Sequence, residues 1–519
     1  MESWYPMIFE TQWIGLRHVL LASVILVCLW KTVVDRRVVK LPPGPTGWPF
    51  IGILPTLADG ERVYKKFTKM SAKYGPIFSA RMGLFDCVVL NDYDIIREAT
   101  CKSGDMFLDR PRTPLFEILG GGKGIGGAFY SEGWKEHRRF SLKIMRSYGI
   151  GQAEIEPMIA REAWFLNKEF ASENGKPFNP TPYLGNATAN IICAIIFGDR
   201  FNFDDPWFVK MMSILSDMGH LFRVSGPVNC FPFLRHVPFS SYKKLRKLVD
   251  DHYVFLDKKI NEVKEGYEES NPRQFIDAYL DEVRKREVDG FVGTLDEAHL
   301  KFDISDMFNA GTETSANTLK WAVLYLALFP DIQGRVQDEM DRVVGRKRMP
   351  LLSDRSQLPY TMATLAEVQR IGCIAPLSVP HAATEDTTLR GYDIPKGTIV
   401  TLNIWSVMFD PKTWPEPEKF RPERFLNDDG CYSKNERLIP FSIGRRNCVG
   451  EQLAVMELFT YFTHLLHRFK LRYPDNEPQP DLEGFFGATL GPYPYNVCAF
   501  ERLLDFDYKQ PILPDQSST

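Results

Sequence analysis

The sequence lacks the features that mark several common classes of protein. No two cysteines have the C-x-x-C spacing, and nine cysteines is an odd number, which disfavours both a disulfide framework and a zinc knuckle. This cysteine usage suits a main body that folds in a reducing compartment. There is also no basic surplus, because the formal net charge is −3, so the composition does not support nucleic-acid binding.

Low-complexity linkers, repeats and breaks in composition are absent from the connector at Leu41 to the polar end near Pro514. The 519 residues are 44% hydrophobic and 13% aromatic, which is enough for an extensive core. We therefore expect one large domain over residues 41–519. It begins with a stiff proline-rich connector that sets its orientation.

Long hydrophobic runs are rare, and the one marked example is residues 13–30. A bilayer-spanning helix needs about 20 mostly apolar residues, so this segment suffices if Arg17 and His18 extend toward one membrane surface. Basic residues follow it and acidic residues precede it, which predicts a cytosolic C-terminal body. A cleaved secretory signal is disfavoured because the charged n-region and the small-residue cleavage site are missing. Residues 1–40 are expected to form an uncleaved signal anchor and a basic linker.

The residue periodicity predicts a mainly α-helical fold with a smaller β region. Helical spacing dominates, for example from Leu245 to Val263. Strand patterns predict two hairpins, which would join Ile77–Met82 to Cys87–Leu90 and Thr388–Tyr392 to Thr398–Leu402.

Two segments are rich in residues that interrupt regular structure. Gly226–Phe239 is an apolar loop by its prolines, and it would either pack inward or dip into a lipid interface. Gly120–Ala128 contains the G-x-G-x-x-G spacing, but the segment before it is loop-like rather than a strand. We interpret it as a flexible loop, not a phosphate site.

The most constrained cysteine is Cys448. Gly444 and Gly450 bracket it, Arg446 lies two residues before it, and a helical pattern begins at Glu451. A thiolate there would face the positive end of a helix, which favours an anion. Such a sulfur is expected to stay deprotonated, as either a nucleophile or a metal ligand. Its surroundings alone do not decide between the two.

A long helix is expected from about Leu295 to Phe329, with strongly apolar ends and a polar middle around Asn309–Asn317. Threonine back-bonding and Gly311 make a local bend plausible. Buried acids and hydroxyls are costly unless they are bonded. The middle is therefore either a hydrated polar seam or a proton-delivery site, in which Thr314 binds a ligand and Glu313 connects it to water.

Trp134 and Arg138 lie at i and i+4 on one helix face, and alone they indicate a surface cation–π contact. Their helix is distinctly basic, which is typical of a solvated face but also suits an acidic partner. The basic residues are Lys135, Arg138, Arg139, Lys143 and Arg146.

Glu367 and Arg370 lie at i and i+3 on another helix. In isolation they would be an ordinary surface ion pair. If Arg424 joined them, a buried structural network would fix the irregular segment before Cys448.

Taken together and in this order, these motifs resemble the cytochrome P-450 superfamily of haem-thiolate monooxygenases, most closely the animal microsomal family-2 type. The resemblance covers residues 13 to about 503. It rests on Phe441-x-x-Gly444-x-Arg446-x-Cys448-x-Gly450, Ala310-Gly-Thr-Glu-Thr-Ser315, Glu367-x-x-Arg370, Pro422-Glu-Arg-Phe425, Trp134-x-x-x-Arg138 and the Pro-Pro-Gly-Pro hinge.

The resemblance implies a role for each matching position. Cys448 would be the axial thiolate ligand of haem b, and Phe441 would shield its sulfur. Ala310 would lie flat over the haem ring, and Thr314 and Glu313 would deliver protons during oxygen activation. Positions that match haem-propionate contacts are Trp134, Arg138, His381 and Arg446.

The implied activity is insertion of one oxygen atom of O2 into a lipophilic substrate, such as a fatty acid, steroid or xenobiotic. Electrons would come from NADPH through a flavoprotein reductase, with cytochrome b5 as a further donor. A single-pass protein of the endoplasmic reticulum membrane with a cytosolic catalytic domain is implied. By analogy, the substrate walls are the 107–128 loop, the middle of the long helix, Ala375–Val379 and Gly484–Leu490.

Three other functions are compatible with parts of this pattern. A haem-thiolate isomerase or dehydratase would not use O2, but such relatives typically lose the acid and alcohol that Glu313 and Thr314 supply here. A non-enzymatic haem carrier would not require Thr314. A cysteine-nucleophile hydrolase would need a histidine partner that the sequence does not indicate.

Overall fold

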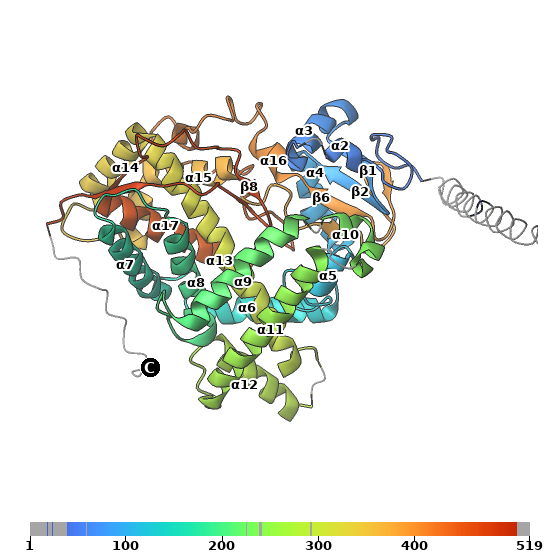
Figure 1. Cartoon of the computed structure of the whole chain (residues 1–519), viewed down its shortest axis with the longest axis horizontal. Helices are drawn as coiled ribbons and strands as arrows, with labels where there is room; N and C mark the ends of the chain where they lie inside the picture. The colour runs from blue at the N-terminus through green and yellow to red at the C-terminus, as the bar shows by residue number, and fades with distance from the viewer. Residues whose placement is uncertain are drawn as a thin grey trace, which may run out of the picture.

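The computed structural model describes residues 39–58, 60–224, 226–237, 241–290 and 293–505, together with positions 18 and 23. The expected mainly helical fold with small sheets is confirmed (Figure 1). The helices are α2 Leu54–Leu57, α3 Val63–Tyr74, α4 Tyr93–Arg97, α5 Pro114–Ile118, α6 Glu132–Ser147, α7 Glu156–Ser172, α8 Thr181–Phe197, α9 Pro206–Val224, α10 Gly226–Cys230, α11 Ser241–Glu265, α12 Phe275–Val288, α13 Glu297–Leu328, α14 Pro330–Val343, α15 Pro359–Gly372, α16 Ile404–Met408 and α17 Glu451–Arg468. The strands are β1 Ile77–Met82, β2 Phe85–Leu90, β3 His381–Ala382, β4 Thr387–Leu389, β5 Tyr392–Ile394, β6 Ile399–Leu402, β7 Phe469–Arg472, β8 Phe485–Phe486, β9 Leu490–Gly491 and β10 Cys498–Glu501.

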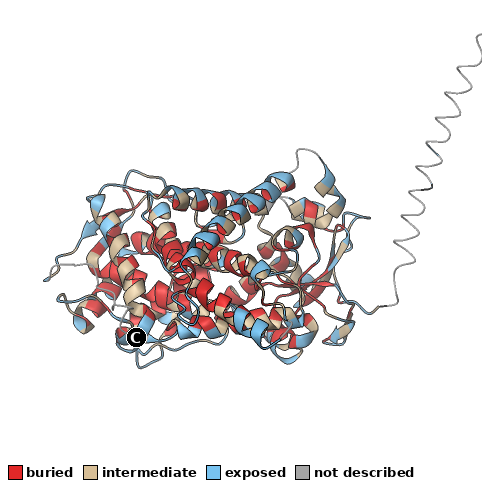
Figure 2. Cartoon of the chain, turned by 90° about the horizontal axis from the view of Figure 1, so that it is seen from below, coloured by how far each residue is buried: buried red, intermediate tan, exposed pale blue. Residues whose placement is uncertain are grey.

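Helix α13 runs through the middle of the molecule and matches the long helix expected from the sequence. It begins after Asp296, whose carboxylate accepts the His299 N–H over 2.9 Å and so caps the helix. Its apolar second half packs against α8, α15 and α17. Figure 2 shows the buried residues concentrated along these central helices. The second half of α13 is therefore held inside the protein.

A four-stranded sheet in the order β1-β2-β6-β3 forms the second part of the fold. The first predicted hairpin is confirmed, since β1 and β2 pair antiparallel. The second is wrong: β4 pairs with β5 around a turn at Arg390, and β6 instead pairs with β2 and β3. The reason is burial, because all four residues of β6 are buried and only the interior sheet accommodates such a strand.

The segment expected to be a loop at Gly226–Phe239 is instead largely helical, with α10 followed by a 3₁₀ turn at Pro232–His236. Pro227 and Pro232 occupy first-turn positions, where a missing N–H costs nothing. The prolines therefore start helices here rather than breaking them.

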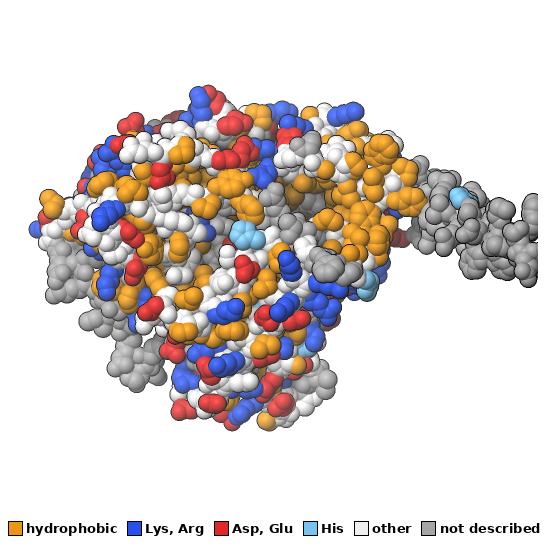
Figure 3. Space-filling view, viewed as in Figure 1, with side chains coloured by type: hydrophobic (Ala, Val, Ile, Leu, Met, Phe, Trp, Pro, Cys, Tyr) orange, Lys and Arg blue, Asp and Glu red, His pale blue; other side chains and the backbone are white. Residues whose placement is uncertain are grey.

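Exposed hydrophobic side chains gather at the end of the molecule that holds β1 and β2 (Figure 3). The Leu84 N–H donates to the Cys230 carbonyl over 3.0 Å, which joins the β1–β2 turn to α10. We call this set the apolar patch: Leu41, Trp48, Phe50, Ile51, Leu84, Phe233 and Val237.

The expected membrane anchor at residues 13–30 lies outside the described residues, apart from single positions. Among the helices that the structure describes, none combines the length and the apolar character needed to span a bilayer.

Candidate active site

A tight turn before α17 holds Cys448. Its N–H donates to the Phe441 carbonyl over 3.0 Å, and the Asn447 N–H donates to the Gly444 carbonyl over 3.2 Å. Gly444 has a φ of +88°, and a Cβ at this position would lie 2.3 Å from the Thr100 carbonyl oxygen. Only glycine satisfies both constraints. The backbone of the turn is thus fixed by its own hydrogen bonds and by a neighbouring segment.

The Cys448 side chain lines a hollow of about 820 Å³ beside this turn. The thiol is accessible from the hollow, yet burial among protein atoms raises its pKa. The Gly450 N–H and the Arg138 guanidinium oppose that rise, and Glu451 adds to it. Burial therefore opposes the start of α17 at this sulfur, and a positive charge such as a bound metal ion would favour the thiolate.

The middle turn of α13 is open, although the helix is buried on both sides of it. Ala310 is exposed, whereas Phe308 and Thr312 are buried. Solvent therefore reaches the centre of this helix. The Thr314 Oγ1–H donates to the Ala310 carbonyl over 2.7 Å, the i−4 bond expected for threonine, and α13 continues without a break.

Three arginines gather near the Cys448 turn without a carboxylate partner. Among the described residues, every side-chain hydrogen bond of Arg110, Arg138 and Arg446 ends on a carbonyl oxygen, including the side-chain oxygen of Asn447. Burial lowers the pKa of Arg110 to about 10 and that of Arg446 to about 8. Asp109 and Asp306 raise the pKa values of Arg110 and Arg446 but form no ion pair with them, and buried cations without a paired counter-charge are costly. This cluster is therefore suited to a bound anion.

The sequence reasoning missed Arg110. It lies in the segment Phe107–Pro114, which showed only loop character. Its Nη1–H groups donate to the Val379 and Pro380 carbonyls over 2.9 Å each, contacts that bridge distant parts of the chain. The Arg-Pro-Arg spacing was the available signal, but it carries little information without those partners.

Trp134 and His381 lie beside the same arginines. The guanidinium carbon of Arg446 is 3.8 Å from the Trp134 ring centroid, whereas that of Arg138 is 6.0 Å away. The Trp134 Nε1–H donates to the Ile125 carbonyl over 3.1 Å. His381 Nδ1 lies 2.8 Å from the Phe107 carbonyl oxygen, and burial lowers its pKa to about 3, so its ring is neutral.

The glycine-rich loop binds an anion from its own chain. The N–H groups of Ile125 and Gly126 donate to Asp306 Oδ2 of α13 over 2.7 and 2.8 Å. A Cβ at Gly124 would lie 2.4 Å from the same oxygen. The glycines therefore allow the loop to close over α13, and two of its N–H groups are already occupied.

Glu313 points to a different element from its neighbour Thr314. Its Oε1 accepts the Thr489 Oγ1–H over 2.8 Å, and Thr489 lies between β8 and β9. Glu313 and Thr314 are therefore not bonded to each other: Glu313 is bonded to Thr489, and Thr314 is bonded to the Ala310 carbonyl.

Glu367, Arg370 and Arg424 meet in a buried network. Glu367 accepts two bonds from Arg370 over 2.7 and 2.8 Å and one from Arg424 Nε over 3.1 Å. Arg370 also donates to the Met408 and Pro417 carbonyls. The three side chains thereby fix the irregular chain ahead of the Cys448 turn.

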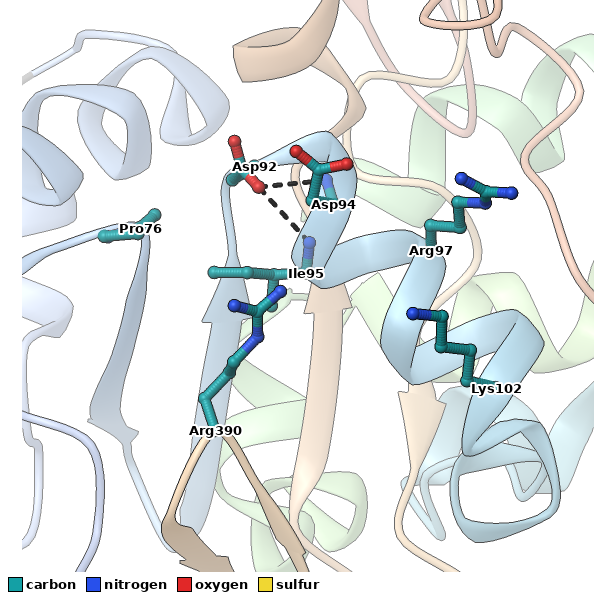
Figure 4. A pocket seen from close by; sticks show the side chains of 7 residues that line it. All are labelled: Pro76, Asp92, Asp94, Ile95, Arg97, Lys102 and Arg390. Carbon is teal, nitrogen blue, oxygen red and sulfur yellow. Dashed lines mark hydrogen bonds between the residues drawn. The ribbon is translucent and has the colours of Figure 1, made fainter.

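A further pocket, of about 520 Å³, lies on the surface at the start of α4 (Figure 4). Asp92 there accepts the N–H groups of Asp94 and Ile95 over 2.9 and 3.2 Å, which is ordinary helix capping. None of the candidate site residues lines it.

Comparison with known proteins identifies the family. A model of the cytochrome P450 family matches residues 42–499. The chain belongs to the cytochrome P450 family. It is 38% identical to human cytochrome P450 2U1 over 507 residues, which are 93% of each protein. It is 38% identical to human cytochrome P450 2J2 over 498 residues, 94% of this chain and 96% of the relative. With mouse cytochrome P450 2D9 it shares 37% identity over 476 residues, 90% of this chain and 94% of the relative.

The predicted resemblance to family-2 P450s is thus confirmed. The protein is a haem-thiolate monooxygenase, an oxidoreductase that incorporates O2, and it works with a substrate and an electron-donating reductase. When bound, haem iron with a thiolate ligand supplies electron density that favours O–O cleavage.

The residues of this chain fit the haem. Cys448 offers the sulfur on a turn that its own backbone hydrogen bonds fix. The cluster of Arg110, Arg138 and Arg446 has the positive charge that two propionates require. The open turn at Ala310 leaves room for a flat ring because alanine projects only a methyl group there.

Proposed function

We propose that this P450 oxygenates a lipophilic substrate at a membrane, with Cys448 as the thiolate ligand and Thr314 and Glu313 as the proton-delivering residues. The observation that carries the proposal is the turn that holds Cys448 beside three arginines without carboxylate partners. Neither a cysteine hydrolase nor a simple scaffold requires that combination of sulfur and unmatched positive charge.

A lipophilic substrate is favoured by the walls that we assign to its site. The expected walls include Phe485 and Phe486 of β8 and the 107–128 loop. Two charged groups of that region are engaged within the protein: Arg110 is bonded to carbonyls, and Asp306 accepts loop N–H groups. Neither of these two groups is therefore free to anchor an ionic substrate.

Electron transfer through an acidic flavoprotein is supported by cations beside Cys448. Arg138, Arg146, Arg355 and Lys434 line the hollow that contains the sulfur. A basic face at the point nearest the ligand sulfur would attract an acidic donor, which suits an NADPH-dependent reductase and cytochrome b5 alike.

Attachment to the endoplasmic reticulum membrane is supported by the apolar patch. Trp48 is 67% exposed and Phe233 is 61% exposed. The backbone bond between Leu84 and Cys230 joins two parts of the patch into one surface. A hydrophobic surface of this kind would rest on lipid next to an N-terminal anchor and keep the catalytic domain on the cytosolic side.

The test is the carbon monoxide difference spectrum of the reduced protein. We expect the Soret shift of a thiolate-ligated haem in the wild type and its loss in Cys448→Ala. Cys101→Ala is the matched control, because Cys101 is also exposed but lies outside the proposed site. A wild-type spectrum without the thiolate shift would overturn the proposal. If the wild type shows the thiolate shift, changes in haem spin state on addition of fatty acids, steroids and xenobiotics identify the substrate class.

A further inference from the structure

A chain of polar side chains links Glu313 to a lysine two helical turns away. Thr489 Oγ1 donates to Glu313 Oε1 over 2.8 Å and accepts the Asn317 Nδ2–H over 2.7 Å. The Lys320 Nζ donates to Asn317 Oδ1 over 3.0 Å. Glu313, Asn317 and Lys320 follow one face of α13, and Thr489 comes from the turn between β8 and β9.

The hairpin that carries Thr489 is fixed to this helix by several further contacts. Trp321 Nε1 donates to the Leu490 carbonyl over 3.1 Å, and the Tyr495 hydroxyl donates to the Lys320 carbonyl over 2.7 Å. A Cβ at Gly491 would lie 2.8 Å from Asn317 Oδ1, so only glycine leaves room for the amide. The Thr489 contact is therefore part of a built interface.

The opposite side of Glu313 is closed by α9. A Cβ at Gly219 would lie 3.7 Å from Glu313 Oε2, and a Cβ at Gly487 would lie 2.9 Å from the Gly219 carbonyl oxygen. Glu313 is thus enclosed between α9, α13 and the β8–β9 hairpin. A change in the position of α9 or of the β8–β9 hairpin would alter the direction of the Glu313 carboxylate.

The lysine at the end of the chain is electrostatically coupled to Glu313. Burial lowers the pKa of Lys320 to about 8, and the Glu313 carboxylate opposes this change. Tyr495, from the segment packed against Lys320, has a pKa raised well above its ordinary value and stays neutral. On α9, His220 lies against Phe485, with ring centroids 5.2 Å apart.

We propose that Thr489 and Lys320 are positioning residues for the Glu313 carboxylate. Thr489 fixes the direction of the carboxylate through its hydrogen bond, and Lys320 supplies the opposite charge through Asn317. This inference rests on the proposed function, in which Glu313 provides protons.

The first test measures the electrostatic coupling between Glu313 and Lys320 without enzyme turnover. Full-length, haem-loaded protein without reductase is treated with an amine-reactive reagent across a pH series, and labelling of the Lys320 peptide is quantified by mass spectrometry. The midpoint is expected near pH 8 in the wild type. Because the Glu313 charge raises this pKa, Glu313→Gln and Thr489→Val should lower the midpoint, whereas Thr489→Ser should preserve it. An unchanged midpoint in Glu313→Gln would overturn the proposal.

The second test measures coupling, the ratio of product formed to NADPH oxidised. A well-placed general acid contributes about 100-fold to 10,000-fold, so partial loss of its placement in Thr489→Val or Lys320→Met should lower coupling about tenfold. Thr489→Ser and Lys320→Arg should restore it. Equal coupling in all four variants would overturn the positioning role. If the carbon monoxide spectrum lacked the thiolate shift, the proposed function would fail, yet the Lys320 titration would still decide whether the pair exists.

Discussion

Gly444 and Gly450 both belong to the cysteine motif, but they meet different constraints. Gly444 has a φ of +88°, and an added Cβ would lie 2.3 Å from the Thr100 carbonyl oxygen. At Gly450 the nearest atom to an added Cβ would be Cys448 Sγ at 4.0 Å, and the φ is −88°. The first glycine is therefore required by the fold itself, whereas the second leaves space on the sulfur side of the turn.

Gly444→Ala is accordingly expected to prevent stable haem incorporation. The left-handed backbone alone costs about 1–2 kcal/mol, and the clash adds to it. The measurement is the haem-to-protein ratio together with the thermal midpoint. Gly450→Ala is the control and should fold with a normal midpoint. Equal haem content in both variants would contradict this reading of the turn.

Glu367 is the common acceptor of the buried network, so its loss leaves two guanidinium groups without a counter-charge. Glu367→Gln is expected to destabilise the protein by about 3–5 kcal/mol, because a broken buried ion pair exposes an uncompensated charge to a low-dielectric interior. Chemical denaturation measures the change.

The matched control for Glu367→Gln is Arg472→Ala. Arg472 and Asp475 form an ion pair at 2.8 Å with side chains 59% and 72% exposed, so its loss should cost less than about 1 kcal/mol. Similar losses in both variants would mean that the buried network does not have the stabilising role assigned to it.

At the scale of elements, α13 organises the site by binding three separate segments along its length. Asp306 accepts N–H groups of the glycine-rich loop, Glu313 accepts Thr489 of the hairpin, and Ser315 donates to Glu457 of α17 over 2.7 Å. One rigid helix thereby sets the relative positions of parts that lie far apart in the sequence.

The loop attachment predicts a specific pH dependence. Burial raises the pKa of Asp306 to about 6, above its ordinary value of 3.8. Between these values the folded protein holds a proton that the unfolded chain releases, so stability from this group falls as pH rises from 3.8 to 6 and stays reduced above it. The difference between the folded and unfolded pKa values of Asp306 corresponds to a loss of about 3 kcal/mol of stability at most.

Asp306→Asn removes that titration. The stability of the wild type relative to Asp306→Asn should therefore increase when the pH is lowered from 7.5 to 5, as measured by denaturant titration at both values. A difference that does not change with pH would show that Asp306 titrates in the same range in the folded and unfolded states.

At the scale of the whole molecule, we propose separate surfaces for two partners: the apolar patch for the membrane and the hollow around Cys448 for the reductase. Lys143 and Arg146 are exposed on α6, whose other residues include Trp134 and Arg138 of the site. Reversing both to glutamate is expected to slow the first electron transfer about tenfold or more at low salt while leaving the ferric haem spectrum intact. Stopped-flow reduction by the reductase measures the rate.

A charge-matched control for this reversal is Lys244→Glu with Lys247→Glu. Both lysines are exposed on α11, which does not line the hollow around Cys448. Reduction rates that fall equally in both double variants would indicate a general charge effect rather than docking at α6.

The sequence by itself determined the features that depend on short-range chemistry. Apolar patterning predicted α13 and a helix beginning at Glu451, and the spacing around Cys448 indicated a sulfur site before that helix. Glu367 and Arg370 were predicted to pair because three residues separate them on one helix. These features depend on residues only a few positions apart, so they can be predicted without knowledge of the fold.

Only the tertiary structure decided the contacts that join distant segments. Arg110 meets carbonyls more than 260 residues away, and the Glu313–Thr489 bond spans 176 residues. The pairing of β6 with β2, rather than with its sequence neighbour, also follows from burial in the interior sheet. Likewise, the raised pKa of the Cys448 thiol reflects desolvation by the whole protein, which outweighs the local helix start.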